Sequence, residues 1–370
     1  MGEVEDAVYG LAEKRRVRSG KFVLRDFDFK RPALDLTVEK EADERTALEV
    51  YDYPGGYFEP NEGARLAKVR LEEAQVERRT LRVEAACPRI KVGRTLDLTD
   101  AGDLDGTYFV FEVTHEYVKG GAKGQAPRYE TRARLLPGDV PFRPFRTTRI
   151  PTIEGPQTAT VVAPEGAQSE TIHTDEHGRC KVKFHWDRAE AQDDTASCWM
   201  RVSQLQTSGS MMLPRISWEV IVEFLEGNPD RPLVTGRLYN GVQMPPYSLP
   251  DGKTRTAIKT ASTPGGGGSN EIRFEDKAGS EEIMIHAQYD MKVVAANNAT
   301  TKIGHNETTV VTNNASLAVG SNQTTKVTKG SSNTIGADQT VTVGGNRKVE
   351  VNAVSALTVH GSASTTVGGN

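Results

Sequence analysis

The stretch that decides the fold is residues 303–370, which read in blocks of eight IGHNETTV, VTNNASLA, VGSNQTTK, VTKGSSNT, IGADQTVT, VGGNRKVE, VNAVSALT, VHGSASTT and VGGN. We call each block an octad. Its first position is Val or Ile without exception. These first positions are Ile303, Val311, Val319, Val327, Ile335, Val343, Val351, Val359 and Val367. A short, exact period of this kind is typical of a repetitive architecture in which each unit packs against its neighbours.

The other octad positions indicate a strand followed by a turn. The fourth position holds Asn306, Asn314, Asn322, Gly330, Asp338 and Asn346, and then Val354, Ser362 and Asn370. Asn, Asp and Gly tolerate the positive φ angles of sharp turns. The apolar residues of the seventh position are Leu317, Val341, Val349 and Leu357. Because side chains alternate along a strand, the seventh position shares a face with the next first position. We therefore predict a short strand with an inward face and a turn at position four.

The energy balance of one octad favours several chains wound together. One buried Val or Leu contributes about 1.5–3 kcal/mol, whereas ordering eight backbone residues costs about 8–16 kcal/mol. An octad must therefore also make nearly all of its backbone hydrogen bonds and close its strand edges. Three identical chains can supply those edges, with the Val/Ile column along a common trimer axis. The repeat thus predicts an intertwined homotrimeric needle.

Composition limits the classes of function. The length of 370 residues predicts two or three domains, and the net charge of −4 argues against a nucleic-acid binder or a polybasic membrane anchor. Residues 1–18 contain no apolar signal-peptide core, and no apolar run is long enough to span a membrane. Cys87, Cys180 and Cys198 cannot form a full set of disulfides. We expect a chain that needs a route other than a signal peptide to act outside the cell.

Two β-rich regions precede the needle. Residues 1–150 contain alternating strands, the clearest at 109–117, and a helix with Ala64, Ala67, Leu71 and Ala74 on one face. Residues 151–245 contain five or six short strands separated by turns, which is typical of a small OB barrel. Residues 246–270 are rich in Pro, Gly and Ser and predict a linker before the needle at 271–370.

Motifs in these regions resemble the VgrG family in type and order. They are IEGPQTA at 153–159, TDEHGR at 174–179, FHWDR at 184–188, EGNPDRP at 226–232 and GRLYN at 236–240. NEIRFED at 270–276 resembles the family's entry into the needle. YDYPG at 51–55 resembles the end of its tube-like N-terminal domain.

The resemblance implies a mainly β protein. It would contain the C-terminal part of a tube-like, phage-hub-like domain, an OB-fold barrel and a C-terminal intertwined triple-stranded β-helix. It also implies a structural spike of a type VI secretion system, a homotrimer that punctures a target membrane on sheath contraction and delivers effectors. The implied partners are other copies of the chain, Hcp tube rings, a PAAR-repeat tip protein and effector proteins. The chain would reside in the producing cytoplasm and leave through the type VI machine, without a cofactor, a catalytic residue or a nucleic-acid partner.

Three sharper interpretations were weighed against simpler ones. His173, His177, Cys180 and His185 contain possible zinc ligands, but their spacing matches no standard zinc site. Trp186, Arg188, Trp199 and Arg201 could bind single-stranded nucleic acid, or they could pack the barrel. Glu219, Glu223 and Glu226 could suggest glycoside hydrolysis, but a carboxylate pair needs a cleft. We therefore expect no metal and no catalysis.

Two alternatives to the type VI spike remain open from the sequence. One is the baseplate spike of a phage-derived contractile tail. The other is a binding module, in which the barrel recognises an oligosaccharide or nucleic acid and the β-helix only makes it trimeric.

Overall fold

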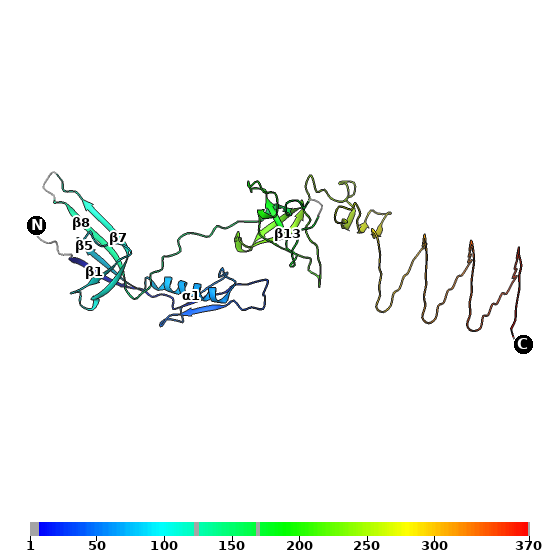
Figure 1. The fold of residues 1–370 in the computed structure, drawn as a ribbon, viewed down its shortest axis with the longest axis horizontal. Coiled ribbons are helices and arrows are strands. Elements are labelled where there is room, and N and C mark those ends of the chain that lie inside the picture. The colour runs from blue at the N-terminus through cyan, green and yellow to red at the C-terminus, as the bar shows by residue number, and fades with distance from the viewer. Residues whose placement is uncertain (1–6, 122–125, 168–170, 369–370) are drawn as a thin grey trace. The chain divides into compact units, whose positions relative to one another are not determined.

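The computed structural model describes residues 7–121, 126–167 and 171–368 (Figure 1). The chain divides into two compact units, Met1–Asp290 and Met291–Asn370. Apart from one α-helix and three short 3-10 helices, all regular elements of the described residues are β-strands. The expected mainly β class is therefore confirmed.

The largest sheet of the first unit lies in the region predicted to be hub-like. Its strands, in spatial order, are β1 (Val8–Arg15), β5 (Arg79–Ala85), β8 (Arg128–Pro137), β7 (Gly106–Val118) and β6 (Thr95–Leu98), all antiparallel. The predicted strand at 109–117 lies within β7. Alternate residues of these strands, such as Val83, Val110 and Leu135, form a fully buried core. The short 3-10 helix η1 (Gly102–Leu104) precedes β7.

A second, smaller sheet carries the helix. It consists of β3 (Val38–Glu41), β2 (Lys21–Leu24) and β4 (Glu49–Asp52), with α1 (Pro60–Gln75) contacting β2 and β3. Ala67 and Leu71 are buried as predicted. Ala64 is exposed, and Gly63 takes its place on the buried face. A Cβ at Gly63 would lie 2.4 Å from the ring of Tyr57, so only glycine lets this aromatic side chain pack there.

The OB barrel is confirmed and is closed by its backbone. Its strands, in spatial order, are β10 (Lys181–Phe184), β9 (Gln157–Val162), β12 (Glu219–Phe224), β13 (Pro232–Leu238) and β11 (Arg201–Val202). Cys180 and Met200 exchange two backbone hydrogen bonds of 3.0 and 2.8 Å. This pair joins the two outer strands and completes the ring. The 3-10 helices η2 (Asp194–Ala196) and η3 (Leu225–Gly227) lie in the barrel connections.

A three-stranded antiparallel sheet follows the barrel. It consists of β14 (Arg255–Lys259), β15 (Glu271–Glu275) and β16 (Glu282–His286), in that order. We call it the base sheet. Strand β14 lies inside the segment predicted to be a linker, because a five-residue strand between Pro- and Gly-rich flanks has little local signal. No helix among the described residues is long and apolar enough to cross a membrane.

The second unit contains extended limbs separated by regular bends, visible as the saw-tooth at the C-terminal end of Figure 1. The bends of the octads lie at 304–305, 312–313, 320–321, 328–329, 336–337, 344–345, 352–353 and 360–361. They occupy positions two and three of each octad, immediately before the predicted turn residue. No Asn, Asp or Gly in residues 303–368 has a positive φ. The period is as predicted, but the stated conformational reason for Asn and Gly is wrong.

Candidate functional site

The candidate site is an interface that one copy of the chain leaves open. In the octads, the first-position side chains from Ile303 to Val359 are 43–54% exposed. The apolar seventh-position side chains are 59–88% exposed. The first position is therefore the more sheltered of the two, although the strand period places both positions on one face; within one chain the predicted inward face is seen only at the first position. A single chain still leaves half of each Val or Ile surface in water.

The backbone of the octads is also without partners. Within residues 291–368, the structure contains no strand pairing and no backbone hydrogen bond. Backbone N–H and C=O groups must be paired wherever they are removed from water. Among the side chains of this range, the hydrogen bonds and ion pairs amount to one surface ion pair, Lys348 with Glu350 at 2.8 Å, which contributes little. The octads consequently need strands from outside their own chain in order to be stable.

The glycines of the octads also indicate that another chain packs against them. Gly304, Gly320, Gly336 and Gly344 occupy the second position at the bends. A Cβ added at any of them would meet no atom of the same chain within 4 Å. Neither φ nor a neighbour in the same chain requires glycine there. A close approach by another chain at the bend would explain the residue.

The base sheet has two chemically different faces. The strand register places Ile258, Ile272 and Ile285 in one cross-strand row, and Thr256, Phe274 and Ile283 in the next. All six side chains share one face, because the side-chain period of a strand is two. The five apolar ones are 40–70% exposed. An apolar sheet face of this kind is an interaction surface, since soluble proteins rarely leave one open.

The opposite face of the base sheet is charged, and Arg255, Lys259 and Arg273 form ion pairs with Glu275, Glu271 and Glu282 of the same chain. Tyr247 lies over it and donates a hydrogen bond from its hydroxyl to Glu271, which is buried. The cations of Arg255, Arg273 and Lys259 lie 4.9, 5.7 and 5.8 Å from the Tyr247 ring centre. Such contacts are favourable for an aromatic ring. The charged face therefore holds the sheet together, and the apolar face is left for a partner.

Comparison with known families fits this geometry. The model of the bacteriophage T4 gp5 C-terminal trimerisation domain matches residues 256–367, which contain both the base sheet and the octads. The phage tail baseplate hub (GPD) model matches residues 1–121. The model of the type VI secretion system/phage-baseplate injector OB domain matches residues 168–239.

The chain is similar to curated spike proteins over most of its length. It is 38% identical over 320 residues to the type VI secretion system spike protein VgrG1b of Pseudomonas aeruginosa, covering 83% of this chain and 43% of that protein. The chain belongs to the VgrG family. VgrG1a of the same organism is 39% identical over 305 residues, covering 79% of this chain and 47% of that protein. This VgrG chain therefore spans less than half the length of these relatives.

A solved structure of an E. coli type VI secretion component, described as similar to the T4 tail proteins gp27 and gp5, also matches this VgrG chain. Its sequence identity is 20% and its TM-score 0.38, over 64% of this chain and 48% of the other.

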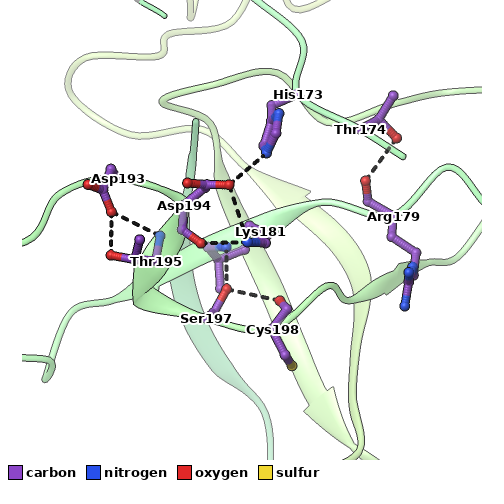
Figure 2. Close-up of polar contacts among 10 residues, drawn as sticks. His173, Thr174, Arg179, Lys181, Asp193, Asp194, Thr195, Ser197 and Cys198 are labelled. Atoms are coloured by element: carbon purple, nitrogen blue, oxygen red, sulfur yellow. Dashed lines mark hydrogen bonds and ion pairs between the residues drawn. The ribbon is translucent and has the colours of Figure 1, made fainter. Parts of the chain in front are cut away.

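The possible zinc ligands of this VgrG chain do not converge. His173 Nε2 lies 3.3 Å from the carboxylate of Asp194 (Figure 2). The His173 ring also packs on Trp199. His177 lies beside Glu176 at 3.5 Å, and His185 lies 3.7 Å from Glu219. Cys180 is buried in the barrel core, and burial raises the pKa of its thiol to about 12. The described residues contain no group of three ligands that could hold a metal.

The cluster in Figure 2 has an evident structural role in the VgrG barrel. Lys181 Nζ donates to the backbone oxygen of Asp194 at 2.8 Å and lies 3.2 Å from its carboxylate. Ser197 Oγ accepts the amide hydrogen of Val182 at 2.9 Å and donates to the carbonyl of Cys198 at 3.1 Å. These bonds fix the connection between β10 and β11, next to the pair that closes the barrel.

Three of the four aromatic and basic candidates of the VgrG barrel contact other side chains of the chain. The Trp186 ring stacks on Phe184 at 5.1 Å, and its indole N–H donates to Gln157. The Trp199 ring lies 4.8 Å from the ring of His173 and 5.1 Å from the ammonium of Lys181. Arg201 lies over the ring of Phe29 at 5.0 Å. Arg188 is exposed.

The three carboxylates that suggested hydrolysis lie on β12 and in the turn that follows it. Glu219 accepts a hydrogen bond from Asn240 at 2.9 Å, which with the nearby His185 lowers its pKa. Glu223 lies on β12, and Glu226 lies in the tight η3 turn with a φ of 54°. Their positions are those of surface charges around the VgrG barrel.

A contact between Asp26 and Arg231 was missed by the sequence analysis. The Asp26 side chain is completely buried and accepts hydrogen bonds from Arg231 at 2.7 and 2.8 Å. It also accepts the amides of Phe27 and Gly56, each at 2.7 Å. Burial acts to raise the pKa of Asp26, but these donors outweigh it and hold the pKa below its usual range. The two residues are too far apart in sequence for any local pattern to connect them.

Proposed function

We propose that this chain forms the OB collar and needle of a homotrimeric type VI secretion spike. The observation that carries the proposal is the octad column, whose first-position side chains are half-exposed and whose backbone is unpaired within one chain. Three copies would bury the column along the axis and pair the strand edges. The names of the curated relatives, type VI secretion system spike proteins, support the same function.

The mechanism that follows is mechanical. In the trimer, each octad would be joined to strands of the other two chains by backbone hydrogen bonds. Load applied along the axis would then be spread over many such bonds, so that the needle unfolds slowly. A sheath contraction would drive the spike through a target membrane. No chemical step by this chain is required, and we propose that it is not an enzyme.

Further parts of the proposal concern the assembly. The hub-like region, which resembles a tube in the family, would dock on Hcp rings. A PAAR-repeat protein would close the needle tip, and effector proteins would travel with the spike. The chain would be made in the cytoplasm and exported by the type VI machine. These partners rest on the family resemblance, and each can be tested by co-purification.

The type VI spike is favoured over the two alternatives. The curated relatives are named as type VI spikes, at 38–39% identity, rather than as phage baseplate proteins. Trp199, which a barrel that binds nucleic acid or sugar would present to its ligand, packs on His173; Trp186 stacks on Phe184 but stays 64% exposed, and the net charge of −4 argues against a nucleic-acid ligand. We therefore retain neither alternative as a second function.

An export assay tests the proposal. A bacterial strain with an active type VI system but without its own spike proteins would express one of three forms. These are the unchanged chain, the Val343→Asp variant and the Val354→Asp variant. Val343 is a first-position residue, whereas Val354 occupies the fourth position, where Asp338 is native. We expect export of the tube protein into the medium with the unchanged chain and with Val354→Asp, and none with Val343→Asp. Equal export with all three, or export in none of them, would contradict the proposal.

A further inference from the structure

A trimer made of octads that all begin with Val or Ile has a register problem. Every first position from Ile303 to Val367 is Val or Ile, so a chain displaced by one octad still presents the same column to its partners. Register is weakly specified wherever a repeating pattern fits equally well after a shift. Some feature outside the repeat must distinguish the correct alignment from the displaced one.

The base sheet has the properties that such a feature needs. It is folded within one chain, with five registered pairs between β14 and β15 and five between β15 and β16. Its sequence does not repeat, and its rows of Ile258, Ile272 and Ile285 and of Phe274 and Ile283 occur once per chain. The octads, by contrast, have no backbone pairing of their own in the described range 291–368. The base sheet is therefore formed before the needle can be.

We propose that the apolar face of the base sheet packs against the same face of two further copies and thereby fixes the register of the octads. This inference rests on the proposed homotrimer. The occupant is a second copy, because β16 ends at His286 and the octad unit begins a few residues later, at Met291. The trimerisation match, residues 256–367, also covers both parts without interruption. The base face is thus continuous along the chain with the needle interface.

The device works by penalising the wrong alignment. A chain displaced by one octad would carry its base sheet with it and uncover Ile283, Ile285 and their neighbours. Specificity of this kind comes from the cost of the alternative state rather than from the strength of the correct one. The charged face cannot replace the apolar one, because Arg273 there already donates to Tyr247 and Glu282 of the same chain.

The inference can be tested by cross-linking mixed trimers. Two forms of the full chain, both in a Cys198→Ser background, would carry Val343→Cys or Val351→Cys and be co-expressed. These positions are one octad apart, and Arg347 and Lys348 lie between them, so trypsin places them on different peptides. In the correct register, a short thiol cross-linker joins only identical peptides. If one chain is displaced by one octad, the cross-linker joins the peptide that contains position 343 to the peptide that contains position 351.

The perturbation is Ile283→Ser, and Ile150→Ser is its matched control. Both isoleucines are similarly exposed in one chain, at 70% and 72%, so neither change disturbs the folded chain itself. Ile150 lies outside the trimerisation match. We expect mixed cross-links to rise by about tenfold or more with Ile283→Ser and to stay at the background level with Ile150→Ser.

The outcomes separate this inference from the proposed function. If Ile283→Ser forms trimers in which only identical peptides are cross-linked, the base sheet does not set the register. A loss of effector export without mixed cross-links would also overturn the register role, and it would assign the apolar face of the base sheet to the binding of cargo. If Ile283→Ser prevents assembly, Ile283→Ala is measured in its place against the same two expectations. A parent chain that forms no trimer refutes the proposed function itself, before any register is measured.

Discussion

Val310 and Val311 are adjacent valines whose side chains lie on opposite faces of the strand in the proposed needle. Val311 occupies the first position of an octad and is 51% exposed, whereas Val310 occupies the eighth and is 85% exposed. Neighbouring side chains of a strand point to opposite faces. We predict that Val311→Asp prevents formation of the trimer and that Val310→Asp leaves it intact.

The size of the effect follows from burial. Covering the exposed half of Val311 is worth about 1 kcal/mol per chain, given about 1.5–3 kcal/mol for a whole side chain. Val311→Asp also brings three carboxylates into one desolvated layer, and an unpaired buried charge costs several kcal/mol. The sum is about 10 kcal/mol or more for the trimer. Val310→Asp remains in water and should change the stability by less than about 0.5 kcal/mol.

The assay is the mass in solution together with the thermal unfolding temperature of both variants and the parent. Val310→Asp serves as the control, because it adds the same charges one residue away. The expected result is a trimer for the parent and for Val310→Asp, and a monomer or aggregate for Val311→Asp. A trimeric Val311→Asp with an unchanged unfolding temperature would refute the axial position of the first octad residue.

Three further predictions concern the first unit. Hydrogen bonds from Arg179 and from the backbone outweigh burial and lower the pKa of Asp175 to about 2. The contribution of Asp175 to the free energy of unfolding should therefore be complete above about pH 4 and be lost as the pH falls towards 2. Asp175→Asn should lower the free energy of unfolding by about 2 kcal/mol at pH 7, measured by denaturant titration, and should weaken its dependence on pH below 4. Arg231→Met leaves the buried Asp26 carboxylate unpaired and should lower the unfolding free energy by about 3–5 kcal/mol, and a midpoint equal to that of the parent would show that the contact is absent. At pH 7 a thiol reagent should label the exposed Cys198 in the folded chain and leave the buried Cys87 and Cys180 unlabelled until denaturant is added, a result that early labelling of Cys180 would contradict.

The parts of the fold that the sequence predicted are those with a local period. The eight-residue spacing from Ile303 to Val367 indicated a regularly bent strand repeat, and the structure bends at that interval. Alternation at 109–117 marked β7, and spacing along one face marked α1. These patterns are visible because each residue's environment depends on neighbours close in the chain.

The features that were missed depend on distant residues. Asp26 and Arg231 belong to separate motifs, and nothing in either one indicates the other. Strand β14 is defined by its pairing with β15 and not by its own five residues. Gly63 faces inward because of the ring of Tyr57, a packing constraint that a helical period cannot show. Asn, Asp and Gly at the fourth octad position were expected to adopt positive φ, whereas the chain bends at positions two and three and, within residues 303–368, has no positive φ there or at position four.

The most direct test of the homotrimeric spike is the mass of the parent chain in solution. Light scattering would be measured on the full chain, and the same sample would then be run in SDS without boiling. We predict three times the mass of the 40.4 kDa chain, and a trimer band that persists in SDS until the sample is heated. A monomer at 40.4 kDa under native conditions would contradict the account, because the octads would then have no partner strands.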